Sequence, residues 1–322
     1  MNLNFLKNPK KIELHYSFVD DSHTMDAFIR NNCERELLSI VKEITYILDI
    51  DVNIETEAYI EGGLKELWSI ASNNKFVIGV ITGILVNVLS TYLTKDNELT
   101  ELQKEELRLK IQVLKKELEE SNEEKPIIIG NDIYEIFNKN LKIIKHKSNF
   151  YKNIHSYQKV TKVTSVILTD NNEPLIPPHT VERKDFEKFI LKTDELPPFI
   201  DENATLEILS PVLKKGKYKW KGIYNGEVIS FSMRDKDFKF QVINSKVQFK
   251  NGTTIDCVLE ISRKINDIGE IYNSGYAVLT VLRIRDENAV EDTPQGKKYL
   301  MKKQAKRNQL NLFDNNDNKN DN

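Results

Sequence analysis

Five residues near the amino terminus have the side chains that a cysteine nucleophile and its base would need: His23, Asp26, Arg30, Cys33 and Glu34. A cysteine nucleophile acts as a thiolate, and a neighbouring histidine can serve as the base that forms it. The helical period that starts at residue 25 places His23 before or within the first turn and Cys33 about three turns later. This spacing favours a helix cap and a buried cysteine over a catalytic pair.

A metal-dependent nuclease would show a different pattern, in which an acidic pair precedes Glu-x-Lys on a strand. Asp256 and Glu260, followed by Arg263 and Lys264, have the wrong spacing for that pattern. The histidines are also scattered, and none is paired at the spacing of metal ligands: His15, His23, His146, His155 and His179. We therefore expect no catalytic residue, no metal site and no cofactor, while an unidentified nuclease stays open as an alternative.

Cations alternate with aromatic residues from Lys217 to Tyr224, in the order Lys-Tyr-Lys-Trp-Lys-Gly-Ile-Tyr. Lysines can neutralise phosphates and aromatic rings can stack on bases, as in proteins that bind single strands. On a strand, however, Tyr218, Trp220 and Gly222 share one side and the lysines share the other. Aromatic residues inside and lysines outside is ordinary core patterning, and this is the interpretation that we favour.

The chain carries its densest positive charge near the carboxyl end. Six basic residues and no acid lie between residues 297 and 307: Lys297, Lys298, Lys302, Lys303, Lys306 and Arg307. Such a cluster predicts contacts with DNA phosphates. Residues 314–322 are Asn and Asp with one Lys, a composition that predicts disorder. Residues 291–322 are therefore expected to form a basic, flexible tail.

The pentapeptide Gln309-Leu310-Asn311-Leu312-Phe313 directly follows these cations. It resembles the peptide that binds the bacterial sliding clamp, in which Ser or Asp is the commoner middle residue. The resemblance implies an extended peptide that places Leu312 and Phe313 in an apolar pocket and hydrogen-bonds through Gln309. It covers five residues and implies recruitment rather than an activity. The alternative is a final helix that packs Leu310 and Phe313 on the preceding domain.

The elements that position these residues begin with a small unit at residues 1–75. Alternating apolar residues predict strands at 12–18 and 51–60, and a helical period from residue 25 to 48 joins them. The expected arrangement is a β-α-β unit whose two strands pair in parallel through a right-handed crossover.

An uncharged stretch at residues 76–93 would form a helix about 27 Å long, close to the ~30 Å of a bilayer core. It predicts either a membrane span or a helix buried in a soluble bundle. Small or polar residues recur at every fourth position and predict self-association between copies: Gly79, Gly83, Asn87 and Thr91. A seam of apolar residues then predicts a short coiled coil that ends near residue 125: Leu107, Ile111, Leu114 and Leu118.

Residues 126–290 begin with a helix and continue with strand patterns, including a hairpin at Asn225-Gly226. This predicts a second domain built as a curved sheet or small barrel, so the whole chain belongs to the α+β class.

The composition sets limits on the function of the whole chain. Its 322 residues contain 47 basic and 49 acidic side chains, so no global positive field predicts a nucleic-acid coat. Two cysteines, and no long apolar segment at the start, suit a reducing cytoplasm. We expect a non-enzymatic, self-associating adaptor whose tail binds the sliding clamp and nearby DNA. The main alternative is a membrane-associated effector of a phage-defence or toxin system, attached through residues 76–93.

Overall fold

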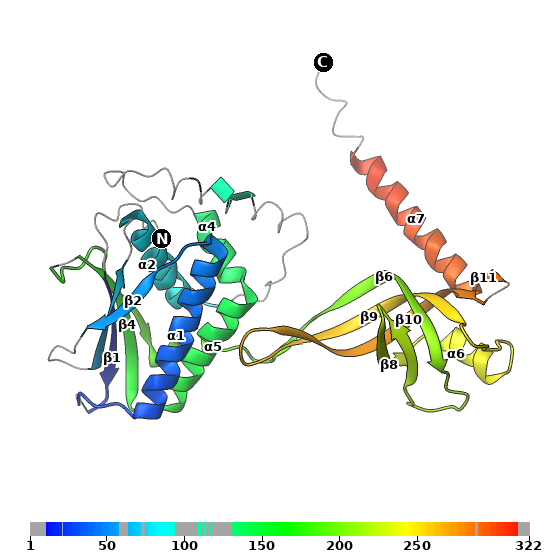
Figure 1. Cartoon of the computed structure of the whole chain (residues 1–322), viewed down its shortest axis with the longest axis horizontal. Coiled ribbons are helices and arrows are strands. Elements are labelled where there is room, and N and C mark those ends of the chain that lie inside the picture. The colour runs from blue at the N-terminus through cyan, green and yellow to red at the C-terminus, as the bar shows by residue number, and fades with distance from the viewer. Residues whose placement is uncertain are drawn as a thin grey trace, which may run out of the picture. The chain divides into compact units, whose positions relative to one another are not determined.

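The computed structural model describes residues 11–20, 22–57, 64–71, 75–93, 109–110, 112–113, 116, 131–169, 171–286 and 289–314. The chain divides into two compact units, shown in Figure 1. The first comprises residues 1–194 with residues 265–270, and the second comprises residues 195–264 and 271–322. The boundary that sequence analysis placed near residue 126 therefore lies at residue 194.

The first unit contains a five-stranded sheet in the order β2-β3-β1-β4-β5, with antiparallel neighbours throughout. Its strands are β1 (Lys11–Phe18), β2 (Asn53–Glu57), β3 (Leu64–Ala71), β4 (Val160–Leu168) and β5 (His179–Glu182). The parallel pairing expected between the strands now seen as β1 and β2 is wrong. Strand β3 lies between them, because consecutive strands joined by a short loop pair more readily than strands joined by a crossover.

Strand β3 escaped sequence analysis because both of its faces are buried. Leu67 and Trp68 are adjacent, and each is almost fully buried on its own side of the sheet. Trp68 belongs to the main core, whereas Leu67 packs with Val166 and Leu168 in a separate cluster. Two-sided burial removes the alternation of apolar and polar residues by which a strand is recognised.

The helices of this unit whose full bounds the structure describes are α1 (Ala27–Leu48), α2 (Lys75–Ser90), α4 (Asn131–Lys139), α5 (Leu141–Ser156) and the 3₁₀ helix η1 (Arg183–Phe189). Helices α1 and α5 lie side by side, as Figure 1 shows. The Asp26 side chain caps α1 by accepting hydrogen bonds from the amides of Phe28 and Ile29, at 2.9 and 3.0 Å. Cys33 lies on the inward face of α1 and is fully buried, as expected.

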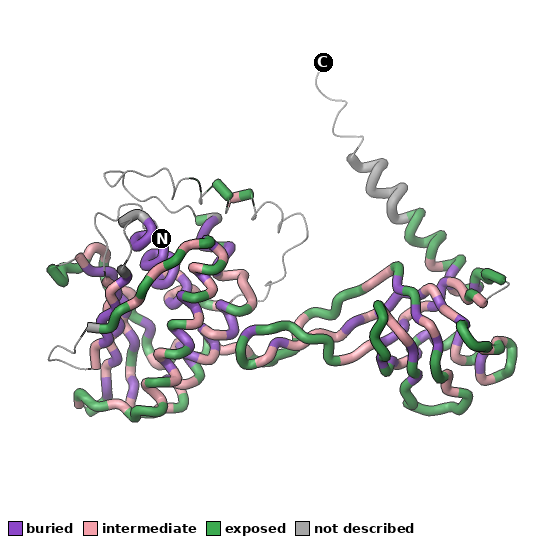
Figure 2. The backbone as a smooth tube through the Cα atoms, in the orientation of Figure 1, coloured by how far each residue is buried: buried purple, intermediate pink, exposed green. Residues whose placement is uncertain are grey.

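Helix α2 is the apolar segment, and its residues from Val77 to Val86 are all buried, as Figure 2 shows. It contacts strands β4 and β5 and helices α1, α4 and α5. In the part of the chain that the structure describes, no helix is long and apolar enough to cross a membrane. Of the two interpretations of residues 76–93, the structure therefore has the buried helix, 16 residues long.

The stripe expected to join two copies is used within the first unit. Gly79 and Gly83 are buried in the core. Asn87 accepts a 2.7 Å hydrogen bond from the Asn138 amide of α4, and the Thr91 hydroxyl donates to the Asn87 carbonyl at 2.8 Å. The structure thus does not present these glycines to a second copy. The coiled-coil seam at Leu107, Ile111, Leu114 and Leu118 lies outside the described residues.

The carboxyl end of α2 is held by two donors from α5. The Tyr151 hydroxyl donates to the Leu89 carbonyl at 2.6 Å, and the Lys147 ammonium donates to the Thr91 carbonyl at 3.0 Å. Both side chains are almost completely buried. A cation is favourable here, because the carbonyl end of a helix carries a partial negative charge. Burial nevertheless lowers the pKa of Lys147 to about 7.

A second buried ionisable group lies between α1 and the sheet. Glu66 of β3 is 2% exposed and accepts a 3.0 Å hydrogen bond from Arg30 Nε, while its other carboxylate oxygen has no partner. Burial raises the pKa of Glu66 to about 7, although Arg30 opposes that shift.

The second unit is built around a closed five-stranded barrel of β6 (Glu195–Ser210), β7 (Trp220–Tyr224), β8 (Glu227–Met233), β9 (Thr254–Ile265) and β10 (Ile271–Arg285). Strands β6, β7 and β8 pair in sequence, β8 pairs in parallel with β10, and β9 closes the ring between β10 and β6. Helix α6 (Lys236–Ile243) connects β8 to β9. This is the connectivity of the OB-fold, a Greek-key barrel. Of the curved sheet and the small barrel expected as alternatives, the structure has the barrel, and it begins at residue 195 rather than near residue 126.

Two further elements complete the second unit. Strand β11 (Val290–Asp292) pairs with the end of β10, and helix α7 (Pro294–Asp314) follows it. The predicted hairpin at Asn225-Gly226 is present, and both residues have the positive φ angles, 51° and 83°, of a type I′ turn.

Replacing Glu66 by Gln should remove a pH dependence of stability. Between about pH 4.5 and 7 the folded state retains a proton that the unfolded state has lost. The free energy of unfolding of the first unit should therefore fall as pH rises through this range, by about 3 kcal/mol in total. Denaturant titrations followed by Trp68 fluorescence, in a Trp220→Phe background, would measure it. Glu66→Gln should flatten the profile, whereas the exposed control Glu173→Gln should not.

Replacing Lys147 by Met should remove a slope of opposite sign. Above pH 7 the folded state lacks a proton that the unfolded state keeps until about pH 10.5. The free energy of unfolding should thus rise with pH, by at most about 1.4 kcal/mol per pH unit. The same titrations test this, with the exposed Lys152→Met as control. A slope that persists in Lys147→Met would contradict the assignment.

Candidate functional site

The carboxyl-terminal segment is helical where sequence analysis expected a flexible tail. Helix α7 starts at Pro294, and the Thr293 hydroxyl caps it by accepting a hydrogen bond from the Gly296 amide at 2.9 Å. Thr293 is itself buried and donates to carbonyls of β10. Gly296 packs so closely that a Cβ there would collide with the backbone of Leu282. The start of α7 is therefore fixed on the barrel.

The first turns of α7 present their cations to solvent. Lys297, Lys298, Lys302 and Lys303 are exposed, as are Leu300 and Met301. Lys303 also forms an ion pair with Glu202 of β6, and the Tyr299 hydroxyl donates to the same carboxylate at 3.0 Å. These hydrogen bonds, that from Lys303 first, lower the pKa of Glu202. We call the contact of Glu202 with Tyr299 and Lys303 the Glu202 clasp.

The clamp-like pentapeptide lies in the last turns of the same helix. Gln309, Leu310, Leu312 and Phe313 belong to α7, as do Lys306 and Arg307. Their side chains lie outside the described part of the structure. The position of the peptide along the helix is thus known, whereas residues 315–322 are not described.

The segment from Pro211 to Lys219 joins β6 to β7 and carries two of the three lysines expected on a strand, Lys217 and Lys219, whereas Lys221 does lie on β7. Strand β7 begins only at Trp220, which is buried in the barrel as expected. Tyr218 is 61% exposed and therefore lies outside the core, contrary to the expected pattern. The alternation was misleading because residues 217–219 precede the strand. We call residues 211–219 the lysine loop.

The residues weighed for catalysis are placed in structural roles. Burial raises the pKa of the Cys33 thiol well above its ordinary value, which makes it a poor nucleophile. Asp256 is paired with Arg285 and Thr205, and Glu260 accepts a 2.7 Å hydrogen bond from Arg234. Among the described residues, no group of three or more His, Cys, Asp and Glu side chains is placed to hold a metal ion.

One contact between helices was not anticipated from the sequence. Glu36 of α1, almost fully buried, lies 2.7 Å from His146 Nδ1 and also accepts a hydrogen bond from Asn149 of α5. No short motif could have linked residues 110 positions apart. The pair ties α1 to α5 and is remote in sequence from both cationic segments.

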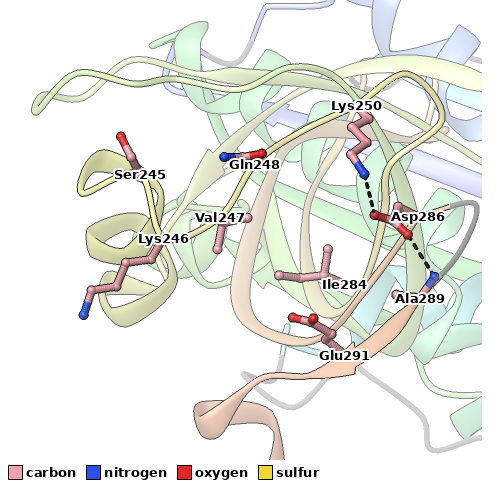
Figure 3. A pocket seen from close by; sticks show the side chains of 9 residues that line it. All are labelled: Ser245, Lys246, Val247, Gln248, Lys250, Ile284, Asp286, Ala289 and Glu291. Carbon is pink, nitrogen blue, oxygen red and sulfur yellow. Dashed lines mark hydrogen bonds and ion pairs between the residues drawn. The ribbon is translucent and has the colours of Figure 1, made fainter.

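A pocket of about 290 Å³ opens between the α6–β9 connection and the end of β10. Figure 3 shows Lys250 pointing toward Asp286, with an ion pair of 3.5 Å, and Asp286 accepting a hydrogen bond from the Ala289 amide. Its residues are Ser245, Lys246, Val247, Gln248, Lys250, Ile284, Asp286, Ala289 and Glu291. Because two lysines and two carboxylates line the pocket, its charge favours neither an anionic nor a cationic ligand.

Comparison with protein-family models, with curated proteins and with solved structures finds no match to this chain. The features that bear on function are therefore those of the chain itself, above all the two cationic segments of the second unit, helix α7 and the lysine loop.

Replacing Glu202 by Gln should loosen α7 without unfolding the barrel. An exposed ion pair contributes about 0.2–1 kcal/mol, so hydrogen exchange of the amides near Tyr299 and Lys303 should accelerate up to about fivefold. Exchange measured by mass spectrometry checks this, with Glu227→Gln as a control of equal charge change. Equal exchange rates in the two variants would show that the Glu202 clasp contributes nothing to the helix.

Proposed function

We propose that the protein is a non-enzymatic adaptor that binds the bacterial sliding clamp through residues 309–313 and contacts nearby DNA. The observation that carries this proposal is the position of the clamp-like pentapeptide. It ends a helix whose start is fixed on the barrel by Thr293 and Gly296. The residues from Leu300 to Ala305 are exposed, and within these turns the barrel is contacted through the ion pair of Lys303 with Glu202. This position, at the far end of a helix that starts on the barrel, supports a role of the peptide in binding a partner.

Binding in an extended form requires the last turns of α7 to unwind. Asn308 and Asn311 have low helix propensity, and the acidic Asp314 is unfavourable at a helix carboxyl end. The terminal turns therefore cost little to open. An affinity in the micromolar range is the natural expectation for a short peptide that is ordered on binding.

The cations of α7 support a position close to DNA. A clamp encircles DNA, and the lysines that precede the pentapeptide would face the phosphates when the peptide is bound. Lys298 and Lys302 are one helical turn apart and exposed, and Lys306 follows at the same spacing. Each contact between a lysine and a phosphate increases the affinity for DNA, and this contribution decreases as the salt concentration rises.

Replacing Leu312 and Phe313 together by Ala should abolish clamp binding, because both apolar side chains that fill the pocket are removed. Surface plasmon resonance with immobilised bacterial clamp would measure the change, which we expect to exceed about 50-fold in Kd. The matched control is Asn311→Ser, which introduces a commoner middle residue and should bind at least as tightly as the parent chain. Unchanged binding by the Leu312→Ala, Phe313→Ala variant would refute the proposal.

A further inference from the structure

We propose that the lysine loop and the adjoining side of α6 bind single-stranded nucleic acid. This interaction goes beyond clamp attachment and does not depend on it. Barrels of this connectivity serve unrelated functions, so the fold alone does not select a ligand. The inference comes from the charge, the exposed ring and the fixation of this particular loop.

The charge of the lysine loop and of the strand β7 that follows it is of one sign. Five exposed lysines and no acid occur between residues 211 and 226: Lys214, Lys215, Lys217, Lys219 and Lys221. The acids next to this stretch along the chain are Glu207 and Glu227, and Asp237 is exposed on α6. Repeated cations without internal ion pairs suit a ligand with repeated anionic groups, which in nucleic acids are the phosphates.

An aromatic ring is already placed among these cations. Tyr218 is 61% exposed, yet its ring packs against the backbone of Gly216. A Cβ at Gly216 would lie 2.6 Å from the ring, and the φ of +149° suits glycine alone. The ring therefore has a support and a free surface, as a base-stacking platform requires.

Helix α6 holds the middle of the lysine loop through a hydrogen bond. Lys239 of α6 donates a 2.6 Å hydrogen bond to the Gly216 carbonyl. The helix is itself fixed by Asp235, which caps the Phe238 amide at 2.9 Å and accepts from the Val281 amide of β10 at 2.8 Å. Trp220, where the loop enters the barrel, is fully buried with its ring 6.2 Å from that of Phe238. A loop fixed at its middle and its end loses little entropy when it binds.

The ring decides between classes of ligand. In a duplex the base faces are stacked on each other, so only a single strand can offer a base to Tyr218. An acidic peptide would match the lysines but would leave the ring without a partner. The combination of five cations with a supported ring therefore favours a single strand over duplex DNA and over acidic proteins.

The test uses the full chain and a fluorescein-labelled (dT)12 probe in anisotropy titrations at several salt concentrations. Lys215→Gln, Lys217→Gln and Lys219→Gln combined should weaken binding more than tenfold at 50 mM salt and lower the salt slope by about 2. The matched control changes three exposed lysines of the first unit, Lys42, Lys152 and Lys184, to Gln. This control should retain the affinity of the parent chain.

Tyr218→Ala should weaken binding between fivefold and a hundredfold while leaving the salt slope unchanged, because it removes stacking and no charge. Tyr218→Phe keeps the ring and should bind like the parent. Circular dichroism of each variant verifies folding, and the phenylalanine variant keeps the test decisive if the alanine variant unfolds.

Three results would overturn the inference: equal affinity for (dT)12 and for a (dT)12·(dA)12 duplex, equal affinity for poly-glutamate, or equal effects of the loop and control triple variants. The Leu312→Ala, Phe313→Ala variant separates this proposal from clamp attachment. It should lose the clamp and still bind (dT)12, so either proposal can fail alone.

Discussion

The backbone carbonyls at the end of helix α2 impose the constraint on which the first unit is built. The helix has almost no polar side chain, so it must lie inside, and its last carbonyls then lie out of reach of water. Helix α5 supplies the missing donors, the Tyr151 hydroxyl and the Lys147 ammonium. The Tyr151 ring in turn stacks on Phe189 of η1 at 4.1 Å. The need of the α2 carbonyls for hydrogen-bond donors thus fixes the position of α5, and the stacking of Tyr151 on Phe189 in turn fixes η1.

Much of the fold could be predicted from local patterns. The hairpin at Asn225-Gly226 is the clearest case, because its two turn residues fix it locally. The first half of β6 cannot be recognised from its pattern, because Pro197 and Pro198 are typical of a loop. There β6 pairs on one side only, with β9, where prolines are tolerated. The assignment of β4 to the first unit could not be predicted, since pairing with β1 joins residues about 150 positions apart.

The candidate sites were predictable to different degrees. The cations and the pentapeptide are visible in the sequence, because both are continuous segments. The exposure of Tyr218 was not visible, since it depends on where β7 begins and on Gly216 beneath the ring. Likewise the stripe at Gly79 and Gly83 could not be assigned to the protein's own core, because a spacing of four suits both intramolecular packing and association between chains. Composition reports which side chains are present, whereas tertiary packing decides which of them a ligand can reach.

The anchored start of α7 affects how tightly the barrel must bind the proposed nucleic-acid ligand. The turns of α7 that precede the pentapeptide, residues 294–308, stay helical when the last turns unwind, and they span about 22 Å from Pro294. A rigid spacer of that length holds whatever is bound at its tip at a nearly constant separation, which corresponds to a local concentration in the millimolar range. A copy anchored by its carboxyl end would keep the barrel occupied even if the isolated interaction had a dissociation constant far above cellular ligand levels. Shortening or breaking the spacer would therefore change occupancy without altering a single contact at either end.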